Sequence, residues 1–136
     1  MEPRIRPVER DDAFALAALR VQQDRERGLA SREGFLREFA DAFLADFGSY
    51  RGWLAEQTDG DPLGCLLLRR VPGLPTLAGP GRPEQWQVQQ DFVCPTHRSG
   101  DLRSRLAHTA DRAALGAGAR VLAAGEGGGA APPLRP

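Results

Sequence analysis

The fold is decided by residues 86–122, which read WQVQQDFVCPTHRSGDLRSRLAHTADRAALGAGARVL. Residues 86–93 are expected to form a strand, and 95–100 a short turn. A helix is expected from Asp101, because leucine and alanine recur on one helical face as far as Ala117. Residues 120–123 then form a last strand. Because the helix connects two strands, we expect those strands to be parallel, with a right-handed crossover.

The remaining sequence predicts a mixed α/β sheet around this unit. A first strand over 4–10 precedes two helices, one capped by Asp11 or Asp12 and one capped by Ser31 and ended by Gly48. After Gly48 the apolar residues no longer recur at helical spacing, and their pattern is that of strands. The later elements expected are a strand at 53–56, a tight turn at 58–61, a buried strand at 63–68 and a Pro/Gly-rich loop at 71–83.

Composition limits the classes of protein to consider. The chain has 136 residues, of which 41% are hydrophobic and 26% charged, which is typical of one globular domain. We expect that domain over 1–124 and a disordered Gly/Ala/Pro-rich tail over 125–136. The zero net charge argues against a nucleic-acid partner. No apolar stretch is long enough for a membrane span and no signal peptide is evident, so a cytoplasmic location is expected.

The two cysteines do not predict a metal site. Cys65 and Cys94 lie far apart, without CxxC spacing and without histidines at ligand spacing. They are interpreted as small buried apolar residues.

The junction between residues 93 and 103 carries the functional inference. A strand that enters a helix through a tight turn forms an anion site, because the first amides of the helix lack partners and the helix dipole adds positive charge. Arg98 and Arg103 could add charge-assisted hydrogen bonds to a phosphate.

At this junction the sequence resembles the GNAT superfamily of N-acetyltransferases, over roughly residues 4–123. The resemblance lies in the order of elements and in the run Val93-x-Pro95-x-x-Arg98 with the helix that follows. It implies a GNAT-like mixed sheet with helices on both faces. It also implies acetyl-CoA as co-substrate, with its pyrophosphate on the loop and helix after the fourth strand and its pantetheine arm between splayed fourth and fifth strands. The acetyl group would pass to a primary amine of a small molecule or peptide. The implied cofactor-binding residues are Phe92, Val93, Arg98, Ser99, Gly100, Asp101, Leu102 and Arg103.

The phosphate signature of that family is only partly kept. In the pattern Gln/Arg-x-x-Gly-x-Gly/Ala, Arg98 matches the first position, but Asp101 and Arg103 stand at the glycine positions. A Cβ there obstructs the approach of a pyrophosphate, and the aspartate adds a negative charge. A catalytically impaired GNAT-like binding or interaction module therefore remains the alternative.

The C-terminal part also departs from the family, which continues beyond its fifth strand with a helix and a hairpin. Here Ala123 is followed mostly by Gly, Ala and Pro, so we expect a fold truncated after the fifth strand or completed by a partner chain. The open edge of that strand would favour a homodimer.

Two carboxylates are candidates for the general base that an amine acceptor needs. Asp91 lies two residues before Val93, near the end of the fourth strand, and Glu56 ends the second strand. The alternative for Asp91 is a rim residue facing water. The alternative for Glu56 is a solvated residue at the mouth of the hairpin.

Overall fold

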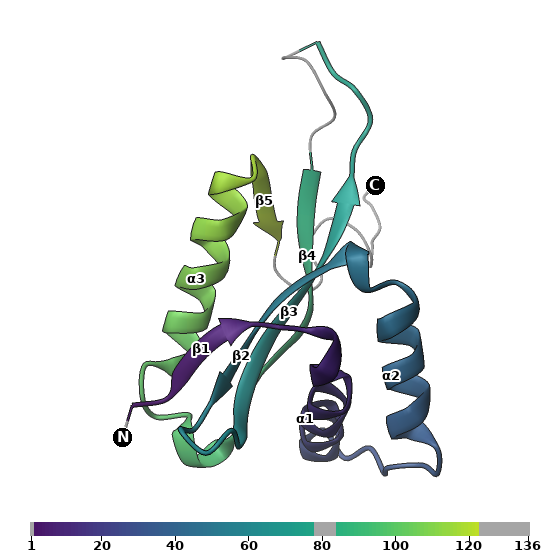
Figure 1. The fold of residues 1–136 in the computed structure, drawn as a ribbon, viewed down its shortest axis with the longest axis vertical. Helices are drawn as coiled ribbons and strands as arrows, with labels where there is room; N and C mark the ends of the chain where they lie inside the picture. The colour runs from purple at the N-terminus through teal and green to yellow at the C-terminus, as the bar shows by residue number, and fades with distance from the viewer. Residues whose placement is uncertain (1, 78–83, 123–136) are drawn as a thin grey trace.

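The computed structural model describes residues 2–77 and 84–122, and in these ranges three helices pack against one mixed sheet (Figure 1). The sheet order is β1-β2-β3-β4-β5. The pairs β1–β2, β2–β3 and β3–β4 are antiparallel, and the pair β4–β5 is parallel. The mixed α/β class and the parallel final pair are as the sequence predicts. The strands are β1 (Arg4–Pro7), β2 (Tyr50–Glu56), β3 (Pro62–Pro72), β4 (Glu84–Val93) and β5 (Ala119–Leu122), and the helices are α1 (Ala13–Glu26), α2 (Phe35–Ala45) and α3 (Leu102–Gly116).

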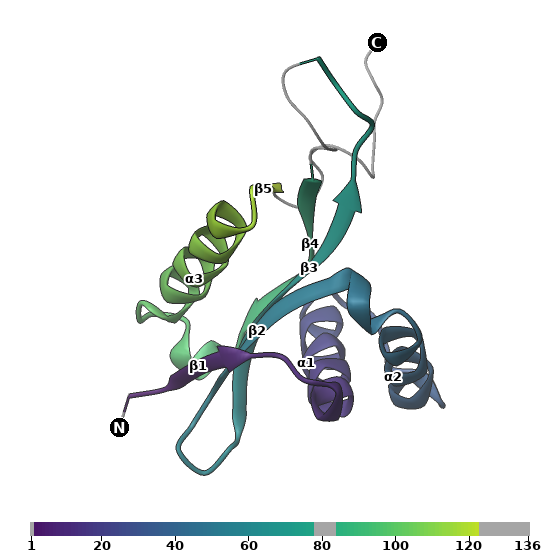
Figure 2. The ribbon, with the colours of Figure 1, turned by 45° about the horizontal axis from the view of Figure 1, so that its top comes forward.

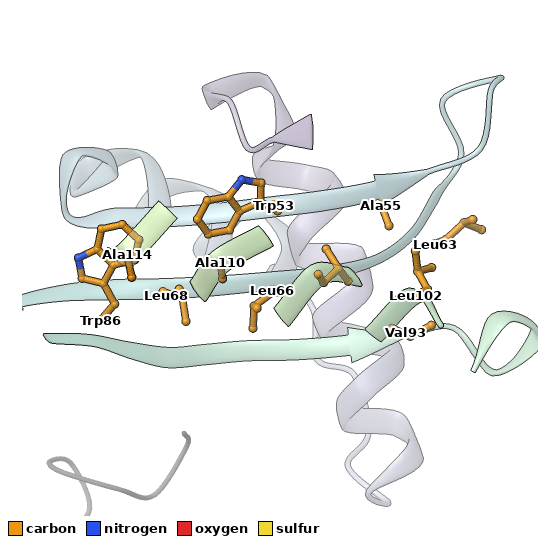
Figure 3. Close-up of a cluster of buried hydrophobic side chains, with 11 residues drawn as sticks. Trp53, Ala55, Leu63, Leu66, Leu68, Trp86, Val93, Leu102, Ala110 and Ala114 are labelled. Carbon is orange, nitrogen blue, oxygen red and sulfur yellow. The ribbon is translucent and has the colours of Figure 1, made fainter. Parts of the chain in front are cut away.

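The helices cover opposite faces of the sheet, with α3 on one side and α1 and α2 on the other (Figure 2). Each face has its own apolar cluster. On the α3 face, side chains of β2, β3 and β4 point toward α3 (Figure 3), among them Trp53, Leu66 and Trp86. On the other face, Leu54 and Phe92 pack with α1 and α2. The central strand β3 is buried on both faces because both clusters draw on it.

Several predicted boundaries are wrong by a few residues. The second helix begins at Phe35, after Gly34 at φ +81°, and not at Ser31. It ends at Ala45, and Gly48 lies in a short 3₁₀ turn. A capping residue must lie directly before the first turn of its helix. Ser31 does not, because the chain remains irregular for three more residues before α2 begins.

The first strand is also shorter than predicted, because β1 ends at Pro7 and Arg10 lies in a 3₁₀ turn. Asp12 does stand at the start of α1, but its side chain does not cap the helix. Its carboxylate instead binds Arg6 and accepts a hydrogen bond from the Glu9 amide. The predicted loop over 71–83 begins later, since β3 extends to Pro72. Its residues 78–83, and the predicted tail over 125–136, lie outside the described residues.

Strand β4 carries a bulge at Gln89. Leu67 pairs with Gln90 and Leu68 pairs with Val88, so Gln89 is an extra residue without a partner on β3. The described part of β5 pairs with β4 only over Glu84–Gln87. The rest of β4 therefore has no strand partner on that side within the described residues.

Candidate active site

A groove of about 530 Å³ runs along the unpaired part of β4. Helix α1 forms one wall and Arg103, in the first turn of α3, the other, while the floor is β4 from Val88 to Asp91. A larger hollow of about 720 Å³ lies on the other side of α3, against β1. The β4 groove is the better candidate site, because the strand edge beside it has no partner strand among the residues that the structure describes. Its lining residues are Arg20, Gln23, Arg27, Val88, Gln89, Gln90, Asp91 and Arg103.

The start of α3 leaves backbone amides free. The first intrahelical bond runs from the Arg105 amide to the Asp101 carbonyl, at 2.9 Å. Within the described residues, the amides of Leu102, Arg103 and Ser104 have no acceptor, and the exposed Asp101 side chain does not cap them. These amides and the helix dipole together favour an anion at this end of α3.

Arg98, predicted to bind phosphate, holds the junction together. Its Nε and Nη2 donate to the Val93 carbonyl at 3.1 and 2.7 Å, and Nη2 also reaches the Glu26 carboxylate at 2.9 Å. The guanidinium lies over the Phe92 ring, with its carbon 5.5 Å from the ring centre. Arg98 thus ties the end of β4 to α1, and only Nη1 is left to meet a phosphate.

Asp91 and Arg103 face each other across the groove. Arg103 Nη2 donates to Asp91 Oδ2 at 3.0 Å, which links the first turn of α3 to β4. The Asp91 side chain is 31% exposed, and its Oδ1 has no partner within the described residues. A carboxylate with one free oxygen beside a groove can accept a proton from a bound amine.

Glu56 does not line this groove, and the alternative of a solvated residue at the mouth of the hairpin is wrong, because its side chain is buried. Its carboxylate is buried and binds the guanidinium groups of Arg4 and Arg6, the second at 3.0 Å. These hydrogen bonds from Arg6 and Arg4 lower the pKa of Glu56 below its usual value, although burial opposes the shift. Arg6 continues the network to Asp12. The structure therefore does not bring Glu56 and Asp91 together.

The residues predicted to bind the cofactor fall into two groups. The side chains of Phe92, Val93 and Leu102 are buried in the two apolar clusters, so only their backbone can meet a ligand. The remaining five are exposed around the start of α3, and they are Arg98, Ser99, Gly100, Asp101 and Arg103.

Sequence reasoning missed Arg20 and Gln89. Arg20 lies on α1, and its Nη1 donates to the Gln89 carbonyl at 3.2 Å, which connects the helix to the bulge. A single arginine on a helix and one of two adjacent glutamines carry no local signal for such a contact. The pairing of β3 with β4 has to be known before the bulge can be located.

The comparisons with known proteins bear on the fold. No protein-family model and no curated protein matches the chain. Solved structures do match. A predicted acetyltransferase from Clostridium acetobutylicum, solved with acetyl-CoA, superposes with a TM-score of 0.74 at 14% identity, over 89% of this chain and 79% of that one.

The chain has the GNAT fold. A GCN5-related N-acetyltransferase from Ralstonia eutropha is 25% identical, with a TM-score of 0.65 over 89% of this chain and 82% of that one. A ribosomal-protein-alanine N-acetyltransferase from Brucella melitensis biovar Abortus is 20% identical, with a TM-score of 0.66 over 89% of this chain and 79% of that one. The predicted GNAT resemblance is thus confirmed at the level of fold.

Two further findings concern only the described residues. None of their helices has the length and apolar composition needed to span a bilayer. They contain no cluster of His, Cys, Asp and Glu arranged for a metal ion. Cys65 is buried and Cys94 partly buried, and both are free thiols.

Proposed function

We propose that this chain is an N-acetyltransferase that moves an acetyl group from acetyl-CoA to a primary amine of a small molecule or peptide. One observation carries the proposal: the groove along β4 reaches Arg103, in the first turn of α3, where the backbone amides have no acceptor within the described residues. The GNAT fold supports it, since the Clostridium acetobutylicum neighbour was solved with acetyl-CoA. When bound, acetyl-CoA would supply the acetyl group in activated form, as a thioester.

The residues present fit such a ligand. In this proposal the amides of Leu102, Arg103 and Ser104 receive the pyrophosphate, and the unpaired edge of β4 offers backbone groups to the amide-containing pantetheine arm. Asp101 brings a negative charge to the same end of α3. Arg103 carries the opposite charge two positions along, and its guanidinium can turn from Asp91 toward a phosphate.

Asp91 would act as the general base. Its free Oδ1 takes the proton that the amine loses as the nitrogen forms its bond to the acetyl carbon. The carbon–sulfur bond then breaks, with water protonating the thiolate. Tyr50, the only tyrosine, is the first residue of β2, and its hydroxyl accepts a hydrogen bond from Arg69. It does not line the β4 groove.

Calorimetry with acetyl-CoA, followed by an assay of CoA release in the presence of amines, tests the proposal. Binding in the micromolar to low millimolar range and amine-dependent release of CoA are expected. Asp91→Asn should bind acetyl-CoA like the unaltered protein but turn over about 10²- to 10⁴-fold more slowly, which is the range of a lost general base. Absence of binding at millimolar acetyl-CoA would contradict the proposal.

A second candidate, the catalytically impaired binding module, is favoured by the chemistry of the loop. Arg98 is engaged by Glu26 and the Val93 carbonyl, and side chains stand at the two glycine positions of the family signature. Replacing both Asp101 and Arg103 by glycine separates the candidates. A gain in acetyl-CoA affinity without turnover in the unaltered protein would favour the impaired module. Turnover in the unaltered protein would exclude it.

A further inference from the structure

A second hollow, of about 160 Å³, lies between α2 and the sheet, on the other side of the bulge from the β4 groove. It shares Arg20, Gln89 and Gln90 with that groove, so the two spaces meet at the bulge. A neighbouring hollow of about 240 Å³ shares its walls at Phe43 and Tyr50. At about 160 Å³ the hollow beside the bulge is smaller than a typical ligand pocket, so it suits one side chain of a ligand and not a whole ligand.

The charged residues that line these two hollows are all positive. Arg20 is the charged residue that lines the hollow next to the bulge, and Arg51 is the charged residue of its neighbour. No carboxylate from the described residues lines either one. Acceptors with several amino groups need carboxylates around them, so this lining disfavours them. It favours an acceptor that carries an anionic group.

Arg20 is held in place and keeps a donor free. Its Nη1 binds the Gln89 carbonyl at 3.2 Å and its Nε lies 3.3 Å from Asp24 Oδ2. Nη2 has no partner within the described residues. The same aspartate also lies 3.9 Å from Arg27, so one carboxylate is shared between two arginines and Arg20 is incompletely neutralised. A fixed guanidinium with a free donor suits a carboxylate.

The walls of the hollow suit an apolar group. Phe43 and Tyr50 lie with ring centres 5.4 Å apart, and Phe39 and Leu67 complete the lining. Aromatic walls of this kind contribute apolar contact area to a ligand side chain.

We propose that the acceptor is a free amino acid with an apolar side chain. Its carboxylate pairs with Arg20, its side chain lies against Phe43 and Tyr50, and its amine extends past the bulge toward Asp91. This inference rests on the proposed function, because it assigns the acceptor of the same transfer. It narrows a general amine to one class and names Arg20 as the residue that selects it.

Direct binding tests the inference without requiring turnover. Calorimetry with L-phenylalanine and with 2-phenylethylamine, which lacks only the carboxylate, is carried out with and without CoA. At least tenfold tighter binding of phenylalanine is expected. Arg20→Gln should weaken phenylalanine binding by about tenfold to hundredfold and leave phenylethylamine unchanged. Arg20→Lys should retain part of the preference. Arg37→Gln, an equal charge change at an exposed position of α2 that lines neither hollow, should have no effect.

The outcomes separate the two proposals. If both compounds bind equally, if neither binds, or if the folded Arg20→Gln protein binds phenylalanine normally, the amino-acid acceptor is wrong even where acetyl-CoA binds. If phenylalanine binds through Arg20 but acetyl-CoA does not bind, the carboxylate site is supported and the proposed acetyl transfer fails. Circular dichroism of each variant verifies that it is folded.

Discussion

Glu56→Gln should lower the stability of the protein without affecting turnover. The Glu56 side chain is 5% exposed and accepts hydrogen bonds from Arg4 and Arg6. Water cannot replace those bonds at a buried site, whereas the two arginines, at 65% and 27% exposure, partly regain solvent. A hydrogen bond to a charged group contributes about 1.5–3 kcal/mol. Since glutamine keeps one acceptor oxygen, the expected loss is about 2 kcal/mol.

The pH dependence of this stability difference tests the reasoning more strictly than its size at pH 7. Because the folded protein holds the pKa of Glu56 below its usual value, the stabilisation is complete above about pH 5 and is lost as the pH falls through the folded value. Urea denaturation from pH 7 to pH 3 should therefore show a stability difference between the unaltered protein and Glu56→Gln that is constant near neutrality and shrinks in acid.

A surface pair provides the matched control. Glu38 binds Arg32, and both side chains are 61% exposed, so Glu38→Gln should change stability far less. The reasoning is refuted if Glu56→Gln is as stable as Glu38→Gln at pH 7, or if the difference does not shrink in acid. A large loss of turnover in a stably folded Glu56→Gln protein would instead make Glu56 the base.

Three further predictions follow from packing and burial. Gly64→Ala should destabilise the protein by about 1–3 kcal/mol, because a Cβ would lie 2.6 Å from a backbone oxygen of β4. Urea denaturation measures this loss, and unchanged stability would show that the two strands can move apart there. Burial raises the pKa of the Cys65 thiol to about 12. Iodoacetamide at pH 8 should therefore label the partly exposed Cys94 first. Equal labelling of the two cysteines would contradict the burial of Cys65. Asp101→Gly alone should increase acetyl-CoA affinity if the aspartate opposes the pyrophosphate, as calorimetry would show.

The order of elements could be predicted because it depends on local patterns. The buried run at 63–68, the turn at 58–61 and the helix after Asp101 all appear where apolar spacing and turn residues predict them. The start of α2 could not be predicted, since Ser31 ranks above Gly34 as a cap residue by composition. Packing against α1 places the helix start instead, with Gly34 supplying a backbone conformation that serine rarely adopts.

The site was predictable in position but not in its contacts. The free amides at α3 follow from a strand, a turn and a helix in succession, which the sequence contains. The partner of Arg98 is Glu26, 72 residues away, and the partner of Arg20 is the bulged strand, 69 residues away. Such contacts depend on how α1 packs on the sheet, and no local pattern contains that information.

The extra residue in β4 determines which face of the sheet each later side chain of that strand points to. Before Gln89, even-numbered residues such as Trp86 face α3, and after it the odd-numbered Asp91 and Val93 do so. Deleting one residue here would exchange the two sides of the strand, turning the Asp91 carboxylate into the apolar layer under α1 and Phe92 toward the groove. This strand should therefore tolerate changes of residue type far better than any change in its length.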